Sequence, residues 1–336
     1  MNKERVAYID ILRFIGITLI ILAHVKPPSP WFEIRMFDVP LMVFVSGLAI
    51  VASKGVIYST KYILHRIKRL LFPVWLFFPV YYLISVLLYR LWEIDIYMSG
   101  KSFLYSMILI ENVGYVWIIK VFILIALVSP LLLWLKNNIK CSLLFYVVVL
   151  LMLLFHHILV SQSNLLNNVL LSEYLFYITS YGTFFFLGSL AMRQTDCALG
   201  FFALLVLGVW YGLLSCQLGE FANLDDLLLD IRNGKYPPHF GFVCYGLFCS
   251  CSLFIIVRRF SMQKGLSLFR FIGSNTLWIY LYHIPFVKIF AKNDWCWVYN
   301  FFITYSMALL LVASQLYLVK RLQNKYNIFI LKYLKG

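Results

Sequence analysis

Charged side chains are scarce in this sequence of 336 residues, and acidic side chains are the scarcest. Asp, Glu, Lys and Arg make up 13% of the chain, whereas hydrophobic residues make up 62%. Only 14 residues are Asp or Glu, against 29 Lys and Arg. A soluble domain of this size is about a quarter charged and close to half apolar. The composition therefore excludes an ordinary soluble domain and favours a chain whose apolar surface contacts lipid.

Several motifs of other protein classes are missing as well. None of the seven cysteines has the pair spacing of a zinc or redox motif. The chain has no G-x-S-x-G nucleophile elbow. It also has no internal repeat, which disfavours an inverted-repeat transporter. No small-residue cleavage site follows the first apolar run, so we expect that run to be retained as a helix. We predict no bound metal or cofactor.

Apolar runs recur along the whole chain. A transmembrane helix needs about 20 mostly apolar residues. Ten runs fit this length: 6–25, 36–53, 70–90, 115–135, 141–160, 174–192, 198–215, 238–257, 271–290 and 297–319. The apolar stretch 103–110 is too short and is expected to be re-entrant or interfacial. We therefore predict an all-α polytopic protein with one integral-membrane domain over 1–336 and no appended soluble domain.

The cationic residues predict the orientation of these helices. With the N-terminus in the cytoplasm, 19 Lys and Arg fall on the cytoplasmic side and 8 on the other, and Arg13 and Lys120 lie within spans. This asymmetry follows the positive-inside rule and predicts that both termini are cytoplasmic. The net charge of +15 is thus explained by topology, not by nucleic-acid binding. It also gives the inner face affinity for anionic lipids or an anionic substrate.

The first predicted helix carries three ionisable side chains. Asp10 and Arg13 are three residues apart and can pair on the helix surface. Arg13 and His24 are eleven residues apart, about three turns, so they share a face and lie about 16 Å apart along the axis. A charge within a span costs about 2.5–3.5 kcal/mol and usually marks a functional cavity. The alternative is that Arg13 only pairs with Asp10 or snorkels, and that His24 caps the outer interface.

The second helix and the segment after it offer further candidates. The run FDVPLMVFVSG at 37–47 places Asp38 at the start of the helix. Ser46 and Gly47 give it a small surface for a neighbouring helix or a ligand. In the following segment, Arg66 and Arg69 are three residues apart, and two guanidinium groups on one side make a good phosphate clamp. A plain positive-inside loop is the alternative.

The ninth predicted span contains Ser274, Tyr280 and His283 in the run IGSNTLWIYLYHIPF. Phe271 is at the inner end of the span, and His283 lies twelve residues beyond it. This spacing places His283 outward of the midplane, about level with His24, where it could line the same cavity. A structural role is the alternative for a single histidine in a helix.

Six segments together resemble a known family. They are IDILRFIGITLIILAH with Arg13 and His24, FDVPLMVFVSG, the basic run 66–69, YGTFFFLGSL, GSNTLWIYLYH and YPP at 236–238. In order and spacing they resemble the bacterial membrane acyltransferase-3 family. These segments run from residue 10 to residue 285, which is most of the chain.

The resemblance implies a function. Members of this family transfer acyl groups, most often acetyl, from acetyl-CoA on the cytoplasmic side to hydroxyls of surface polysaccharides or lipid-linked glycans. It implies a multi-pass protein of the bacterial plasma membrane, with acetyl-CoA as co-substrate and the glycan and membrane lipids as partners. Arg13 and His24 are then the expected catalytic residues, with His24 as the base.

The other candidates receive supporting roles under the same resemblance. Arg13, Arg66 and Arg69 are expected to hold the donor, and Asp38 to orient His24. The remaining residues expected around the cavity are Asp10, Ser46, Ser274, Tyr280 and His283. Two other functions stay open from the residues alone: a transporter or flippase of an acyl or glycan intermediate, and a structural partner in polysaccharide assembly.

Overall fold

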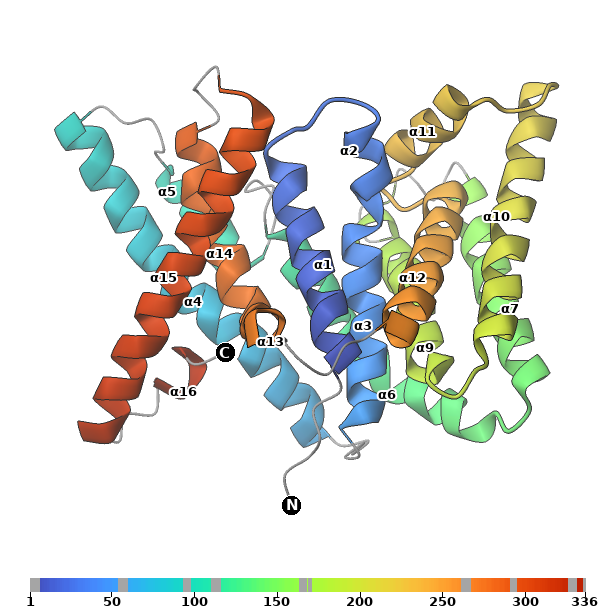
Figure 1. Ribbon diagram of the computed structural model, residues 1–336, viewed down its shortest axis with the longest axis horizontal. Coiled ribbons are helices and arrows are strands. Elements are labelled where there is room, and N and C mark those ends of the chain that lie inside the picture. The colour runs from blue at the N-terminus through green and yellow to red at the C-terminus, as the bar shows by residue number, and fades with distance from the viewer. Residues whose placement is uncertain are drawn as a thin grey trace.

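The chain is helical almost throughout, in a computed structural model that describes residues 7–53, 60–92, 98–109, 116–162, 168, 171–260, 267–290, 295–325 and 331–334. No strand occurs in these ranges (Figure 1). The elements are α1 (Ala7–His24), α2 (Trp31–Ile34), η1 (Arg35–Phe37), α3 (Asp38–Ala52), α4 (Thr60–Trp92), α5 (Gly100–Met107), α6 (Trp117–Asn138), α7 (Ser142–Ser161), η2 (Leu171–Leu175), α9 (Phe176–Ala191), α10 (Asp196–Leu218), α11 (Leu224–Asn233), α12 (Phe240–Phe260), α13 (Ser267–Ser274), α14 (Thr276–Phe290), α15 (Trp297–Lys325) and α16 (Leu331–Leu334).

Eight helical segments within the described residues are long and apolar enough to cross a membrane. They correspond to α1, α2–α3, α4, α6, α7, α10, α12 and α15. The two other predicted spans fall on α9 and α14, which have 16 and 15 residues. The structure confirms an all-α polytopic membrane protein, while the total of ten spans and the side of the termini stay predictions.

Three predicted boundaries differ from the structure. Helix α4 begins at Thr60 instead of residue 70, so Arg66 and Arg69 lie in its first turns and not in a loop before it. The ninth predicted span is two helices, because Nδ2 of Asn275 donates to the Phe271 carbonyl at 2.7 Å and competes with the helical pattern there. The short stretch 103–110 falls largely on α5.

Helix α9 is the centre of the bundle. All of its residues except Ile178 and Thr179 are buried, and it packs against α3, α6 and α7. Two glycines allow its crossing with α3, because a Cβ at Gly47 would collide with the Phe185 carbonyl and a Cβ at Gly188 with the Phe44 carbonyl. Small residues let transmembrane backbones approach closely. The small surface predicted at residues 46–47 is therefore a helix-packing surface at Gly47.

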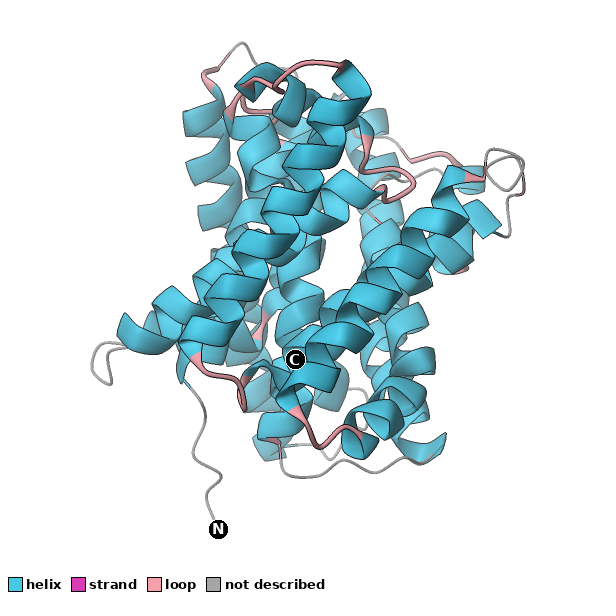
Figure 2. Cartoon of the chain, turned by 90° about the vertical axis from the view of Figure 1, so that its right-hand side faces the viewer, coloured by secondary structure: helices cyan, strands magenta, loops and turns pink. Residues whose placement is uncertain are grey.

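The outer helices present large apolar side chains to their surroundings. Leu143 on α7 is 72% exposed, Phe201 on α10 is 71% exposed and Leu310 on α15 is 61% exposed. Apolar exposure on this scale is typical of a lipid-facing surface. Figure 2 shows the same bundle from the side, with the helices running roughly along its height.

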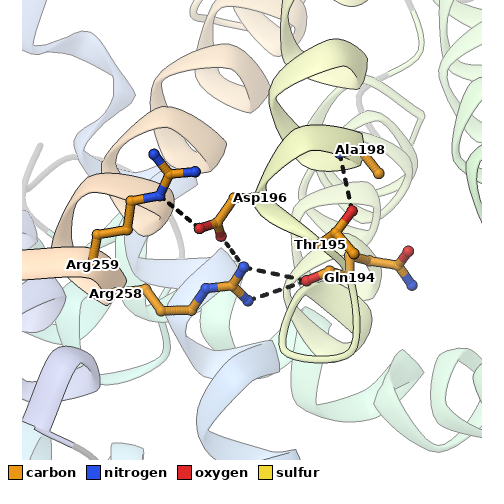
Figure 3. A network of polar contacts seen from close by, with 6 residues as sticks. All are labelled: Gln194, Thr195, Asp196, Ala198, Arg258 and Arg259. Carbon is orange, nitrogen blue, oxygen red and sulfur yellow. Dashed lines mark hydrogen bonds and ion pairs between the residues drawn. The ribbon is translucent and has the colours of Figure 1, made fainter.

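A polar network fastens α10 to α12 at one end of the bundle (Figure 3). Nε of Arg259 donates to the Asp196 carboxylate at 2.7 Å, and Arg258 donates to the same carboxylate and to the Gln194 carbonyl. Thr195 caps α10 by accepting from the Ala198 N–H at 3.2 Å. The two arginines lie in the last turn of α12, where the helix dipole favours cations.

Candidate active site

A cavity of about 650 Å³ opens between α1, α4, α6, α13 and α14. Helix α1 contributes Arg13, Ile17 and Ile20, which follow one another along a single helical face. Helix α13 approaches α1 closely at Gly273, where an added Cβ would lie 2.9 Å from the Asp10 carbonyl oxygen. Met42 and Ser46 of α3 line the cavity too. Gly273 lines the cavity as well, so the close contact between α13 and α1 lies at its edge.

Among the described residues, all charged side chains that line this cavity are cations. They are Arg13, Arg66, Arg69 and Lys332, accompanied by His65. The carboxylate of Asp10 lies 3.8 Å from the Arg13 guanidinium but is itself buried. Arg66 and Arg69 project from successive turns of α4, as the spacing predicted. The surplus of positive charge suits a polyanionic ligand with phosphate groups.

Two histidines, His24 and His283, contact each other beside the cavity but outside its lining. Nε2 of His283 lies 2.9 Å from Nδ1 of His24, so α14 and α1 are joined by a direct hydrogen bond. The level predicted for His283 from its distance to Phe271 is therefore confirmed. Ile20 and Tyr280, each about one turn from a histidine of the pair, line the cavity. The Tyr280 ring centroid lies 6.5 Å from that of His24.

The hydrogen bonds of the pair define which ring nitrogens carry protons. The Tyr280 carbonyl can only accept, so Nδ1–H of His283 donates to it. In a neutral His283, Nε2 is then the acceptor, and Nδ1–H of His24 must donate. The tautomer of His24 that satisfies both bonds has its lone pair on Nε2. That nitrogen is the one able to take a proton from a hydroxyl group.

Asp38 was expected to orient His24, but the structure gives it other partners. Its Oδ2 accepts from Arg35 at 2.8 Å, and its Oδ1 accepts from the Val39 N–H at 2.8 Å. Nζ of Lys235 lies 3.5 Å from the same carboxylate. The residue bonded to His24 is His283, because α14 reaches the end of α1 while Asp38 at the start of α3 faces two cations.

Of the remaining predicted residues, Ser46 and Ser274 line the cavity, whereas Asp10 is buried beside Arg13. Ser46 donates to the Met42 carbonyl at 3.1 Å, and Ser274 donates to the Arg270 carbonyl at 2.5 Å, so each hydroxyl lines the cavity while bonded to its own helix. Sequence reasoning missed other residues of the site: Arg35, His65, Lys235, Lys332 and Tyr333. Lys332 and Tyr333 belong to α16, about 320 residues from Arg13, and no sequence signal joins such distant segments.

Comparison with protein families gives a result that covers nearly the whole chain. Residues 6–318 match the family model described as an acyltransferase domain. The chain belongs to the acyltransferase-3 family. The match includes both histidines of the pair and all three arginines proposed from the sequence. The protein is therefore a membrane acyltransferase. No curated protein and no solved structure matches the chain at a significant level.

Proposed function

We propose that this acyltransferase moves an acetyl group from acetyl-CoA to a hydroxyl of a cell-surface polysaccharide or lipid-linked glycan. The observation that carries the proposal is a cavity lined by Arg13, Arg66 and Arg69, two of whose other lining residues, Ile20 and Tyr280, lie about one helical turn from the His24–His283 pair. Acetyl-CoA is a long molecule with phosphates at one end and the reactive thioester at the other. The cations of the lining would hold the phosphates while the thioester reaches toward the histidine pair.

The cations would hold the donor. Arg66 and Arg69 present two guanidinium forks that can bind phosphate oxygens in pairs. Arg13, deeper on the same face as His24, would contact the carbonyl groups of the pantetheine arm. Because the basic segment around α4 is predicted to be cytoplasmic, this arrangement places donor entry in the cytoplasm. The protein would then work in the bacterial plasma membrane.

The histidine pair would carry out proton transfer. Nε2 of His24 takes the proton of the acceptor hydroxyl while the hydroxyl oxygen attacks the thioester carbonyl carbon. The carbon–sulfur bond then breaks, and the CoA thiolate takes the proton back from the His24 imidazolium. The products are an acetyl ester and CoA with a free thiol. His283 holds the His24 ring in the required tautomer.

The catalytic assignment is tested with purified protein in lipid, labelled acetyl-CoA and surface glycan from cells of the same strain in which the gene is deleted, so that the acceptor hydroxyls are free. Wild-type protein should label the glycan, and His24→Ala should reduce the labelling rate by about 10²-fold or more, the usual effect of a general base. Normal labelling by His24→Ala would refute the role of His24. Movement of substrate across vesicles without ester formation would instead favour the transporter alternative.

The donor assignment has a matched control in the same helix. Arg66→Ala and Arg69→Ala should each weaken acetyl-CoA binding by about tenfold or more, since hydrogen bonds to charged groups contribute about 1.5–3 kcal/mol. Lys68, between them, is exposed and does not line the cavity, so Lys68→Ala should leave affinity nearly unchanged. Equal affinities for all three variants, measured by calorimetry, would remove the two arginines from the donor site.

A further inference from the structure

A second group of cations lies beside the histidine pair, outside the lining of the donor cavity. Arg35 of η1 is 3% exposed and Lys235 of the segment after α11 is 5% exposed. Both approach the single carboxylate of Asp38. The 3-10 helix η1, which carries Arg35, packs against α1, which ends at His24, and both cations lie within electrostatic reach of His24. The donor scheme gives no role to Arg35 or Lys235.

Among the residues that the structure describes, the cluster carries more positive than negative charge. Arg35 pairs with Asp38 at 2.8 Å, and Lys235 approaches the same carboxylate at 3.5 Å, so one carboxylate serves two cations. Burial lowers the pKa of Lys235, while the Asp38 carboxylate raises it and the Arg35 charge lowers it. The nearby Glu33 carboxylate is paired with Arg232. A further anion beside Lys235 would complete the cluster and keep Lys235 protonated.

Polar atoms in the cluster also lack partners. Nε of Arg35 and the hydroxyl of Tyr181 are buried without a hydrogen-bond partner among the described residues. Both residues are at least nine-tenths buried, and Tyr181 lies within electrostatic reach of Asp38 and Tyr236. Buried polar groups without partners are uncommon and costly. A bound ligand with oxygen acceptors would satisfy these atoms.

Aromatic rings lie on one side of the Arg35–Lys235 cluster and form a wall beside it. The Trp117 ring centroid lies 5.1 Å from that of Tyr236 and 6.3 Å from that of Tyr177. Nζ of Lys235 lies 5.9 Å from the Trp117 centroid and 5.6 Å from the Tyr236 centroid. Tyr236 is 54% exposed, so the wall reaches the surface. Aromatic faces pack well against the apolar faces of sugar rings.

The two segments that carry the cations are firmly held. Nε2–H of His156 donates to the Pro238 carbonyl at 2.9 Å, and this bond holds the segment after α11 against α7. The ion pair between Arg232 of α11 and Glu33 of α2 ties that segment to the one that carries Arg35. In Figure 1 α2 and α11 lie side by side at the same end of the bundle. Such anchoring is typical of a preorganised binding site.

We propose that Arg35 and Lys235 form a subsite for a negatively charged group of the acceptor glycan, a carboxylate or a phosphate. This inference rests on the proposed function and names the substrate class of that site. The subsite holds the acceptor by its anion while the aromatic wall supports a sugar ring and a hydroxyl faces His24. An anion on the two cations also offsets their repulsion of the imidazolium that forms during transfer.

The experiment uses the surface glycan of cells in which the gene is deleted, in three forms: untreated, with its carboxylates reduced to alcohols, and with its phosphates removed enzymatically. The full-length protein in lipid is given labelled acetyl-CoA, and kcat/KM is measured for each form. We expect one neutralised form to be acetylated about tenfold or more slowly than the untreated glycan, since charge-assisted hydrogen bonds are lost. The form that loses activity identifies the anion as a carboxylate or a phosphate.

Variants connect this preference to the subsite. Lys235→Met should lower kcat/KM for the untreated glycan by a similar factor, with little further loss on the neutralised form, because the two changes remove the same interaction. Lys235→Arg should retain much of the preference. Lys101→Met is the control, since Lys101 of α5 is an exposed cation 5.7 Å from the Tyr105 ring and should not affect any form.

The outcomes separate the subsite from the proposed function. Equal rates on all three forms would overturn the subsite while acetyl transfer itself stands. An equal loss on every form for Lys235→Met, with unchanged acetyl-CoA binding, would show that Lys235 has only a structural role. If the wild type acetylates no form of the glycan although it binds acetyl-CoA, the proposed function fails, and this inference fails with it.

Discussion

At the scale of single residues, the hydrogen bond between His283 and His24 explains how one imidazole is prepared as a base. The Tyr280 carbonyl fixes a proton on Nδ1 of His283, and that proton sets the tautomer of His24. His283 is therefore a positioning residue, which acts through His24 and does not touch the reacting atoms.

This role predicts different effects for two substitutions. His283→Ala removes the acceptor for Nδ1–H of His24 and should lower kcat by about 10–100-fold, the usual effect of losing such a supporting hydrogen bond. His283→Gln can place a carbonyl oxygen near the lost nitrogen and should recover part of the rate. The KM for acetyl-CoA should stay the same in both. Equal kcat values for the wild type and His283→Ala would contradict the tautomer argument.

The sequence predicted some of these residues better than others. Helical spacing alone was sufficient to bring Arg66 and Arg69 together and to place Arg13 on one face of α1, and all three line the cavity, while their roles stay predictions. The level of His283 was predictable from its distance to the end of its span. Lys235 was not predictable, because its approach to Asp38 depends on how a connecting segment folds back over the bundle.

At the scale of helices, the crossing of α3 and α9 determines where the cavity wall stands. Helix α3 contributes Met42 and Ser46 to the cavity on one face and packs on α9 at Gly47 on another. The two backbones approach closely at Gly47 and Gly188. A Cβ added to either glycine would collide with a carbonyl group of the other helix. Carbonyl groups of a helix cannot rotate away, so the collision has no easy relief.

We expect Gly188→Ala to lower the thermal stability of the protein in detergent, by about 1–3 kcal/mol as for other overpacked cores. The matched control is Gly208→Ala in α10, where nothing lies within 4 Å of the added methyl group. Thermal unfolding followed by circular dichroism or tryptophan fluorescence measures both. A Gly188→Ala variant as stable as Gly208→Ala would show that α3 and α9 are not packed so closely.

Helix boundaries were the least predictable part of the fold. The start of α4 was missed by ten residues because its first turns are basic and do not look like a membrane span, although they continue the same helix. The break between α13 and α14 depends on the Asn275 side chain binding the Phe271 carbonyl. Hydropathy contains no information about such local competition for backbone hydrogen bonds.

At the scale of the whole molecule, the orientation in the membrane determines which substrate enters from which side. Charge asymmetry predicts that the segments before α4 and between α6 and α7 are cytoplasmic. Two native cysteines can test this, because Cys141 precedes α7, Cys296 precedes α15, and both are exposed. Hydrogen bonds from the Leu144 and Leu143 N–H groups lower the pKa of Cys141, so its reactive thiolate persists to a lower pH.

In variants that keep one cysteine each, a membrane-impermeant maleimide added to intact cells should label Cys296 and not Cys141. Permeabilised cells should allow labelling of Cys141 near neutral pH. The reverse pattern would place the donor entrance outside the cell. Labelling of both residues in intact cells would contradict the alternation of spans from which the orientation was predicted.

We propose that donor and acceptor reach His24 from opposite sides of the membrane, the donor past Arg66 and Arg69 and the acceptor past Arg35 and Lys235. The most direct test reconstitutes the protein in one orientation in sealed vesicles, with labelled acetyl-CoA only on the side of Arg66 and Arg69 and the glycan only on the other side. We predict that the wild type acetylates the glycan on the side opposite the donor and that His24→Ala does not. Acetylation only when donor and glycan share a compartment would contradict the claim.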